Sequence, residues 1–354
     1  MTVPKLRVLI VDDSTVARKV LSDALAPEAD IEVITAPNGR VALAKVAHAN
    51  PDLVTLDLEM PEMDGLATLR ALRSTNRRLP VIMFSSLTVR GAASTLDALA
   101  CGANDYVTKP SATTGPEQAI AQIRAELLPR IRALCGREPQ QPAPAILPLG
   151  GLPQGRASTP AIIAIGVSTG GPNALSTVFS TLPPNLPVPI VIVQHMPPIF
   201  TRLLADRLTS QCALPVHEAQ HGTRLLPFNA YIAPGGFHMT VERGLGGASL
   251  ALNTHPPENS CRPAVDVLFR SVARVYGSAS LGVVLTGMGS DGMRGCEHIR
   301  AAGGRVIAQD EESSVVWGMP GFVARAGLAD KVLPLREIAQ ELIRQVTHPR
   351  AIAG

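Results

Sequence analysis

The stretch Ala161–Gly170, AIIAIGVSTG, decides the fold of the C-terminal part of this 354-residue chain. It begins as a run of small and β-branched apolar residues and ends in a glycine-rich turn that carries Ser168. Short apolar runs that are rich in Val and Ile and bounded by Gly or Pro are typical of buried parallel strands. We therefore predict a strand that ends just before Ser168, followed by a helix.

Two further polar residues follow runs of the same kind. His195 comes directly after Val188–Gln194, and Asp291 comes after Leu281–Thr286 and a short glycine turn. In an open α/β sheet, functional side chains gather where parallel strands end. The pattern predicts that Ser168, His195 and Asp291 meet at one sheet edge as nucleophile, base and orienting acid.

The bulk composition bounds the classes of function. The length suggests two or three domains, and 46% hydrophobic residues with only 3% aromatics predict an aliphatic core. A net charge of +3, without basic stretches interleaved with aromatics, argues against a nucleic-acid partner. No run approaches the ~20 apolar residues that cross a bilayer, so we expect no membrane insertion. Five scattered cysteines without a CxxC pair fit reduced thiols, and we expect a cytoplasmic protein.

A change in composition divides the chain. Residues 136–160 contain six Pro and four Gly, a density that neither a helix nor a central strand tolerates. We predict a domain at residues 1–125, a linker at 126–159 that begins as a helix, and a second domain at 160–354.

The first domain alternates strand and helix patterns five times, which predicts a doubly wound (βα)5 parallel sheet. Polar residues again follow the strand-like runs: Asp12, Asp13, Asp57, Ser85 and Lys109. Three carboxylates at one edge repel each other unless a hard cation such as Mg²⁺ neutralises them. A carboxylate beside such a cation, a hydroxyl and a lysine can accept a phosphoryl group.

These residues carry a resemblance to a known family. Residues 6–125 resemble a response-regulator receiver domain in the Asp12-Asp13 pair, Asp57, the Met60–Gly65 loop (MPEMDG), Ser85-Ser86 and Lys109-Pro110. The resemblance implies that Asp57 is the phosphoacceptor and that Asp12, Asp13 and Asp57 hold Mg²⁺. It also implies that Ser85, where many receivers have Thr, is the switch hydroxyl and that Lys109 contacts the phosphoryl group.

In the second domain, Gly166–Gly170 fits the GxSxG pattern, in which small residues let a serine sit on a tight strand-to-helix turn. Backbone N–H groups near Thr169 and Met288 are candidates for an oxyanion hole. The order Ser, His, Asp differs from the Ser, Asp, His order of the α/β-hydrolases, which argues against that fold.

Two other motifs compete for the chemistry. Gly287–Gly292 (GMGSDG) fits GxGxxG after a strand, and Asp310 lies about 20 residues on, as in dinucleotide-binding oxidoreductases. This interpretation leaves Ser168 and His195 without a role. His217–His221 spells HExxH, but zinc binding needs that spacing on a helix, and Pro215 and Gly222 predict a strand and a turn instead. A third alternative is a domain that has lost activity and only binds partners.

The second domain also resembles a family, the CheB protein-glutamate methylesterases of chemotaxis. The matching stretches are Gly166–Gly171 (GVSTGG), Gln194–Pro197 (QHMP), Phe200-Thr201, Tyr231–Gly236 (YIAPGG), His238-Met239, Cys261–Phe269 (CRPAVDVLF), Leu285–Gly292 (LTGMGSDG), Ala308–Glu311 (AQDE) and Ser313–Pro320 (SSVVWGMP). Ala264, where a Ser is common, and Pro227–Asn229, which lacks a usual Gly, depart from the pattern.

The resemblance implies a Rossmann-like domain with a mostly parallel sheet and no cofactor. It implies a hydrolase that demethylates glutamate methyl esters and deamidates glutamines on methyl-accepting chemoreceptors, with Ser168, His195 and Asp291 as its triad. A chemotaxis histidine kinase would be the phosphodonor in this two-component system. We expect the unphosphorylated receiver to restrain the hydrolase and phosphorylation at Asp57 to release it.

Overall fold

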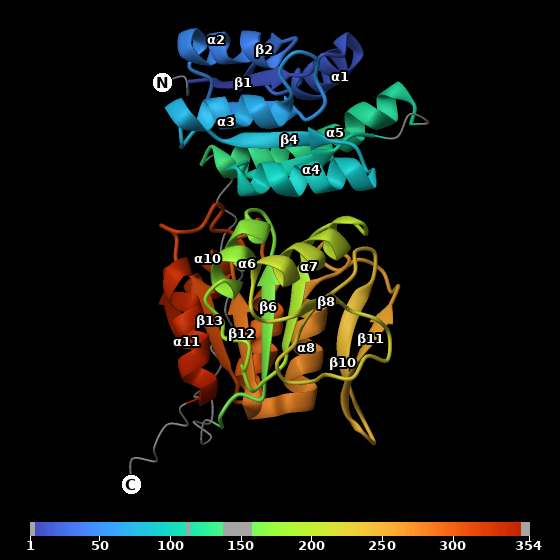
Figure 1. The fold of residues 1–354 in the computed structure, drawn as a ribbon, viewed down its shortest axis with the longest axis vertical. Coiled ribbons are helices and arrows are strands. Elements are labelled where there is room, and N and C mark those ends of the chain that lie inside the picture. The colour runs from blue at the N-terminus through green and yellow to red at the C-terminus, as the bar shows by residue number, and fades with distance from the viewer. Residues whose placement is uncertain (1–3, 111–113, 137–157, 348–354) are drawn as a thin grey trace. The chain divides into compact units, whose positions relative to one another are not determined.

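The structure is a computed structural model that describes residues 4–110, 114–136 and 158–347. The chain divides into two compact units, Met1–Gln140 and Gln141–Gly354 (Figure 1). The start of the predicted linker, to Leu134, is helical. Most of the remainder, residues 137–157, lies outside the described residues, so the domain boundaries stay predictions.

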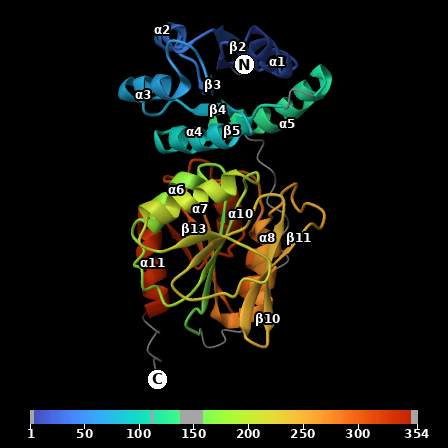
Figure 2. The ribbon, with the colours of Figure 1, turned by 45° about the vertical axis from the view of Figure 1, so that its right-hand side comes forward.

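The first unit is the predicted doubly wound sheet, with five parallel strands in the order β2-β1-β3-β4-β5. Helices α1 and α5 cover one face, and α2, α3 and α4 cover the other (Figure 2). Its elements are β1 (Leu6–Val11), α1 (Thr15–Leu25), β2 (Ile31–Ala36), α2 (Gly39–Ala49), β3 (Leu53–Asp57), α3 (Gly65–Thr75), β4 (Val81–Ser85), α4 (Val89–Ala100), β5 (Asp105–Thr108) and α5 (Pro116–Leu134).

Short polar side chains start four of these helices just beyond the sheet edge. Ser14, Asn38, Asp64 and Thr88 each accept a hydrogen bond from a backbone N–H in the first turn of α1, α2, α3 and α4. Such caps satisfy helix donors that otherwise have no partner. The caps therefore fix where the chain turns from each loop into the following helix. In this way they also stabilise the loops at the edge of the sheet that carries the acidic residues.

The second unit contains a seven-stranded sheet in the order β14-β13-β12-β6-β7-β9-β8, and every described strand pair in it is parallel. A separate antiparallel hairpin, β10–β11, packs against α8. The elements are β6 (Ile162–Val167), α6 (Gly171–Phe179), β7 (Ile190–Gln194), α7 (Phe200–Gln211), β8 (Val216–Glu218), β9 (Ala230–Ile232), β10 (His238–Gly244), β11 (Gly247–Asn253), α8 (Val265–Tyr276), β12 (Ser280–Val284), α9 (Met293–Ala301), β13 (Arg305–Gln309), α10 (Met319–Arg325), β14 (Lys331–Leu333) and α11 (Leu335–Thr347).

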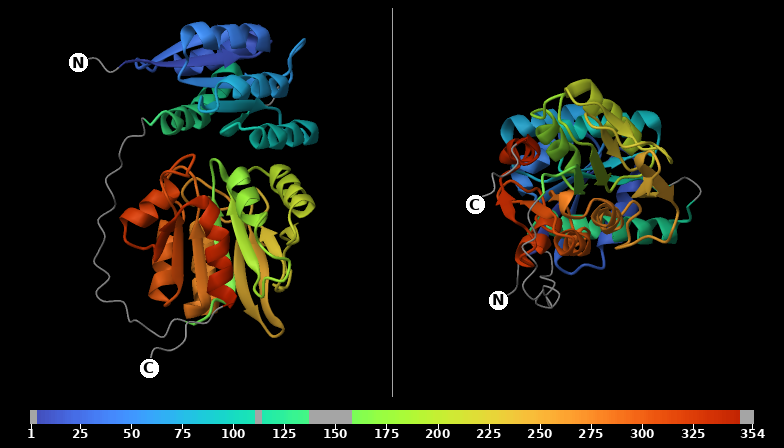
Figure 3. Two further views of the ribbon diagram at one scale, coloured as in Figure 1. Left: turned by 60° about the vertical axis from the view of Figure 1, so that its left-hand side comes forward. Right: turned by 90° about the horizontal axis from the view of Figure 1, so that it is seen from below.

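The order of the strands reverses at β6. The chain moves from β6 to β7 on one side and later returns to β12 on the other side. Helices α6 and α7 lie on one face of this sheet and α8 and α9 on the opposite face, as the right-hand view of Figure 3 shows. Such a reversal leaves a crevice at the carboxyl ends of the central strands, where ligands of open α/β sheets bind.

The helices that the structure describes include none that is both long and apolar enough to span a bilayer.

Gly166 on the central strand should be intolerant of a side chain. A Cβ there would lie 2.3 Å from Cγ1 and 2.8 Å from Cγ2 of Val265, on the first turn of α8. We expect Gly166→Ala to lower the free energy of unfolding of the second unit by roughly 1–3 kcal/mol, because this core has no room for overpacking. Urea unfolding measures the change.

Gly246→Ala is the matched control, since nothing lies within 4 Å of a Cβ at that exposed position. Its effect should stay within about 0.5 kcal/mol. Equal unfolding free energies for the two variants would contradict the predicted clash.

Candidate active site

Ser168 is the first residue after β6, at the edge of the sheet where the strand order reverses. It is partly exposed, whereas the strand before it and the turn after it are buried. Gly170 has a φ of +78°, and a Cβ at Gly171 would lie 1.8 Å from the Gln194 side-chain oxygen. Only glycine fits such positions easily. The two glycines therefore let the chain turn sharply just after Ser168.

His195 is carried to the same edge by the neighbouring strand. In the parallel pair β6–β7, Gln194 is in register with Val167, and the His195 N–H donates to the Val167 carbonyl at 3.2 Å. The Gln194 side-chain amide donates to the carbonyls of Ser168 (3.1 Å) and His195 (3.4 Å). One amide therefore connects the backbone of the two predicted catalytic residues.

Asp291 lies on the turn after β12, which pairs with β6 on the other side. The carboxylate is buried, and it accepts hydrogen bonds from the backbone N–H groups of Val265 (2.7 Å), Asp266 (3.0 Å) and Gly292 (3.0 Å). Val265 and Asp266 begin α8, so two of these donors belong to a helix N-terminus, which favours negative charge. Although burial opposes the charge, His195 and the backbone donors hold the pKa of Asp291 below its ordinary value.

His195 has a partner at each ring nitrogen. Nε2 lies 2.8 Å from Asp291 Oδ2, and Nδ1 lies 3.6 Å from the Cys261 sulfur. Burial disfavours the imidazolium, but the hydrogen bonds to Asp291 and Cys261 outweigh it and raise the pKa of His195 to about 10. Both contacts thus favour the protonated form of the ring.

The structure thus brings the three predicted residues to one edge and joins two of them. Among the described residues, no hydrogen bond connects the Ser168 hydroxyl to His195; the Nδ1 side of the ring faces Cys261 instead. The sequence motifs did not identify Cys261 as a neighbour of His195. It lies 66 residues further along the chain, on a loop without a periodic pattern, so nothing in the sequence indicated the contact.

The residues proposed for an oxyanion hole lie on the turns beside Ser168. The Thr169 carbonyl accepts from the Thr286 hydroxyl at 2.9 Å, which ties its turn to the end of β12. Met288 follows Gly287, where a Cβ would lie 2.8 Å from Ser168 Cβ. Within the described part of the chain, no group accepts the Met288 N–H, which leaves this donor available to a ligand.

The glycine turn that fits a dinucleotide motif is filled by the chain itself. The Gly287 carbonyl accepts from the N–H groups of Gly318 (3.0 Å) and Met319 (2.8 Å). A Cβ at Gly318 would lie 2.7 Å from that carbonyl and 2.9 Å from the Gly289 nitrogen. Asp310 caps a turn by accepting from the N–H and hydroxyl of Ser313. The chain around Gly318 therefore occupies the space over the glycine turn, and Asp310 is already bonded to Ser313. Neither is free to bind a dinucleotide, which disfavours the oxidoreductase alternative.

The remaining histidines of interest have structural partners. His217 is on strand β8, where its Nε2 lies 3.0 Å from the Asn229 side-chain oxygen, and His221 accepts from the Leu252 N–H. The HExxH segment is therefore a strand and a turn, as predicted, and not a zinc-binding helix. His238 is buried, with ring nitrogens bonded to Pro256 and Ala264.

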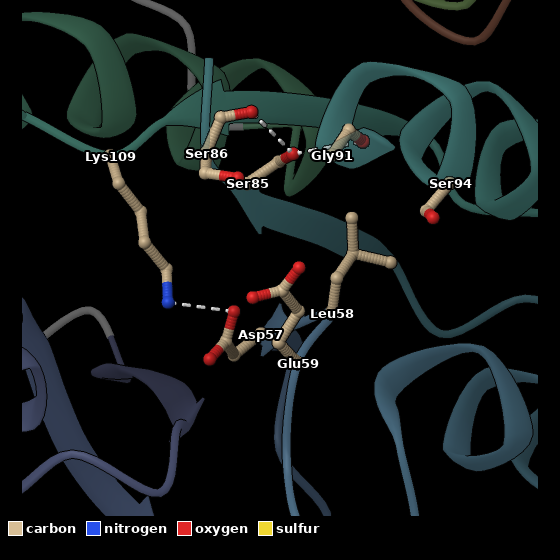
Figure 4. Close-up of a pocket in the computed structure, with 8 residues that line it drawn as sticks. All are labelled: Asp57, Leu58, Glu59, Ser85, Ser86, Gly91, Ser94 and Lys109. Carbon is tan, nitrogen blue, oxygen red and sulfur yellow. Dashed lines mark hydrogen bonds and ion pairs between the residues drawn. The ribbon is translucent and has the colours of Figure 1, made fainter. Parts of the chain in front are cut away.

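A second cluster lies at the strand ends of the first unit. Asp12 and Asp57 are buried, and Lys109 Nζ lies 2.8 Å from Asp57 Oδ1 and 3.4 Å from Asp12 Oδ2. Burial raises the pKa of Asp57, against the opposing effect of Lys109, while the two carboxylates raise the pKa of Lys109 despite its own burial. Figure 4 shows Lys109 extending toward Asp57 beside a cavity of about 80 Å³.

Ser85 lines this cavity, but its hydroxyl is bonded toward α4. It donates to the Gly91 carbonyl at 3.2 Å and accepts from the Thr95 hydroxyl at 2.7 Å. A contact with a group on Asp57 would require the Ser85 hydroxyl to leave Gly91.

The acidic residues of the cluster fit a hard cation. Asp12, Asp13 and Asp57 each offer a carboxylate oxygen within 4.8 Å of the others. Asp12 Oδ2 is buried without a hydrogen-bond donor, although Lys109 forms an ion pair with it. Mg²⁺ prefers such oxygen ligands, so the donor set matches the predicted site.

Known proteins resemble this chain along its length. Residues 163–342 match the family model described as CheB methylesterase, and residues 8–121 match that of the response regulator receiver domain. A Trichodesmium erythraeum protein named "Protein-glutamate methylesterase/protein-glutamine glutaminase" is 52% identical over 350 residues, which cover 97% of this chain and 99% of that protein. A Nocardioides protein of the same name is 51% identical over 356 residues, covering 98% and 97%.

A solved structure also matches the second unit. The catalytic domain of the Thermotoga maritima CheB methylesterase aligns with a TM-score of 0.52 at 45% identity and covers 52% of this chain and 98% of its own. Both sequence resemblances and the predicted α/β fold are thereby confirmed. The chain belongs to the CheB methylesterase family, with a response-regulator receiver domain preceding the catalytic domain.

Proposed function

We propose that this protein is a phosphorylation-activated serine hydrolase that demethylates glutamate methyl esters on chemoreceptors and deamidates receptor glutamines. The observation that carries the proposal is the hydrogen-bonded pair of His195 and Asp291 at the sheet edge that also presents Ser168. The names of relatives that are about half identical over the whole chain give the substrate class.

The proposed chemistry follows from the two nitrogens of His195. Asp291 is bonded to Nε2, so Nδ1 is the atom that can accept the Ser168 proton. The hydroxyl oxygen then attacks the γ-carbonyl of the glutamyl ester, and the imidazolium returns the proton to the leaving methanol. Water repeats the sequence on the acyl-enzyme. A glutamine amide reacts by the same route, with ammonia as the leaving group.

Backbone donors would stabilise the tetrahedral intermediate. We assign this role to the N–H groups near Thr169 and Met288, which flank Ser168 on the turns after β6 and β12. One donor of this kind typically contributes about 2.7–4 kcal/mol in the transition state.

We propose that phosphorylation of Asp57 controls the hydrolase. Mg²⁺ held by Asp12, Asp13 and Asp57 would neutralise charge on the incoming phosphoryl group, and the Lys109 ammonium would contact its oxygens. A histidine kinase of the chemotaxis type is the phosphodonor in this scheme. The Ser85 hydroxyl would exchange its bond to Gly91 for a phosphoryl oxygen, and this exchange is the proposed switch.

The proposed partners and location follow from this chemistry. The substrate is a methyl-accepting chemoreceptor, so the hydrolysis adjusts receptor methylation during adaptation. The five cysteines are free thiols, which is usual in a reducing compartment, and we propose a cytoplasmic location.

Replacement of Ser168 tests the hydrolytic assignment. We expect Ser168→Ala to reduce methanol release from methylated receptor by about 10⁴-fold or more, since removal of a triad nucleophile leaves only residual stabilisation. Ser176→Ala on α6, whose hydroxyl bonds to the Pro172 carbonyl, is the control and should stay near the wild-type rate. Methanol release that survives Ser168→Ala would refute Ser168 as the nucleophile.

The rate should depend on pH through His195. The base accepts a proton only when neutral, so with a pKa raised to about 10 the rate should still climb above neutral pH. Asp291→Asn removes the carboxylate that stabilises the imidazolium, so the rising limb should move to lower pH and the plateau should fall by about 10³–10⁴-fold. Methanol release measured across pH, with the Ser168→Ala rate subtracted, gives both profiles. If the rising parts of the wild-type and Asp291→Asn profiles superimposed, Asp291 would not be what raises the pKa of His195.

The receiver site is tested by a small acyl phosphate as phosphodonor. Activation of the full chain should reach about tenfold or more, since coupling free energies of about 1–3 kcal/mol are typical. Asp57→Asn should abolish activation and keep the unstimulated rate. Asp23→Asn, on the exposed face of α1, is the matched control and should respond like wild type. Activation that persists in Asp57→Asn would place the phosphoacceptor elsewhere.

A further inference from the structure

The proposed hydrolysis leaves the thiol of Cys261 without a role, although this thiol is a neighbour of the base. The sulfur lies 3.6 Å from His195 Nδ1, and the other nitrogen of the same ring is bonded to Asp291. Cys261 is partly exposed, on the loop that precedes α8.

The three groups form a second possible activated nucleophile. A thiol, an imidazole within hydrogen-bond reach and a carboxylate that orients the imidazole are the parts of an activated cysteine nucleophile. When the sulfur attacks an electrophile, Nδ1 is placed to take the proton of Cys261, and Asp291 would stabilise the imidazolium at Nε2.

We propose that Cys261 is a reactive thiol that soft electrophiles and hydroperoxides modify, and that its modification blocks His195. With a hydroperoxide, the sulfur attacks the terminal oxygen while His195 Nδ1 takes the thiol proton, an S–O bond forms and the O–O bond breaks. The sulfur loses two electrons and becomes a sulfenic acid, while the peroxide gains them and leaves as an alcohol after taking a proton. With a haloacetamide, an S–C bond forms and halide leaves.

The consequence for hydrolysis rests on the proposed function, whereas the reactivity of the thiol does not. The Ser168 hydroxyl must reach Nδ1 to lose its proton, and Cys261 already lies against that nitrogen. An oxygen or an acetamide added to the sulfur enlarges the group on this side of the ring. The serine is then excluded from its base. A sulfenic acid is reversible by thiols, so hydrolysis should return on reduction.

Alkylation of the full chain with iodoacetamide, followed peptide by peptide by mass spectrometry, tests the reactivity. Cys212 is the internal reference, since it is also partly exposed and burial raises the pKa of its thiol. We expect Cys261 to react about tenfold faster than Cys212 or more, because the neighbouring His195 can take the thiol proton as the sulfur attacks. Equal rates in the wild-type chain would overturn the proposal without the use of any variant.

Variants test the cause of the reactivity. His195→Gln should slow alkylation of Cys261 about tenfold and leave Cys212 unchanged; an unchanged rate at Cys261 would overturn activation by the imidazole. Ser168→Ala should keep rapid labelling, so failure of the serine mechanism and failure of this proposal give different results.

Methanol release tests the block. In wild type it should fall with the same rate constant as Cys261 is labelled. After treatment with a hydroperoxide it should fall and then recover on addition of dithiothreitol. Full activity with Cys261 completely alkylated would overturn the blocking step.

Discussion

The register of three neighbouring parallel strands is the constraint on which the candidate active-site edge depends. Strand β6 is paired with β12 through Gly166 and Val284 and with β7 through Val167 and Gln194. Each of the three strands ends within a few residues of these pairs. The turns that follow, which carry Ser168, His195 and Asp291, therefore begin side by side. A slip by one residue would invert the faces of the strand. The close approach of α8 to Gly166 opposes such a slip, because only a residue without Cβ fits there.

The helix that packs on Gly166 also organises the buried charge. The first N–H groups of α8 point at Asp291, and Asn259 donates from the preceding loop to both Asp291 and Asp266 at 2.9 Å. Two carboxylates thus share one amide in a buried region. Burial and the neighbouring Asp291 raise the pKa of Asp266 to about 6, whereas Asp291 stays charged because His195 and the helix favour its anion. Both residues are aspartates, so their pKa values differ because of their surroundings and not because of residue type.

Much of this arrangement could be predicted from sequence, and the reason is periodicity. Continuous apolar runs mark the strands, so the sequence alone predicts that the residues at their ends, such as Asp57, Ser168 and His195, lie at sheet edges. The GxGxxG turn was ambiguous, because its local pattern is the same whether a ligand or the chain fills it. Gly318, a distant residue, decides the question.

Irregular segments could not be predicted in this way. Cys261 and Asn259 lie on a loop in which Asn259 has a φ of +52°, and no repeating pattern aims their side chains. The direction of the Ser85 hydroxyl depends on Thr95 one helix later, a tertiary contact with no local signal. Motifs therefore predicted which residues share a sheet edge, whereas hydrogen bonds among loops determine which atoms face each other.

The single amide of Gln194 has a mechanical consequence. Because it holds the carbonyl of Ser168 and that of His195 at once, any thermal displacement of one turn is transmitted to the other. The two strand ends then move as a unit, and the separation between them fluctuates less than the position of either. The spacing between Ser168 and His195 therefore depends on this one side chain as well as on the strand pairing.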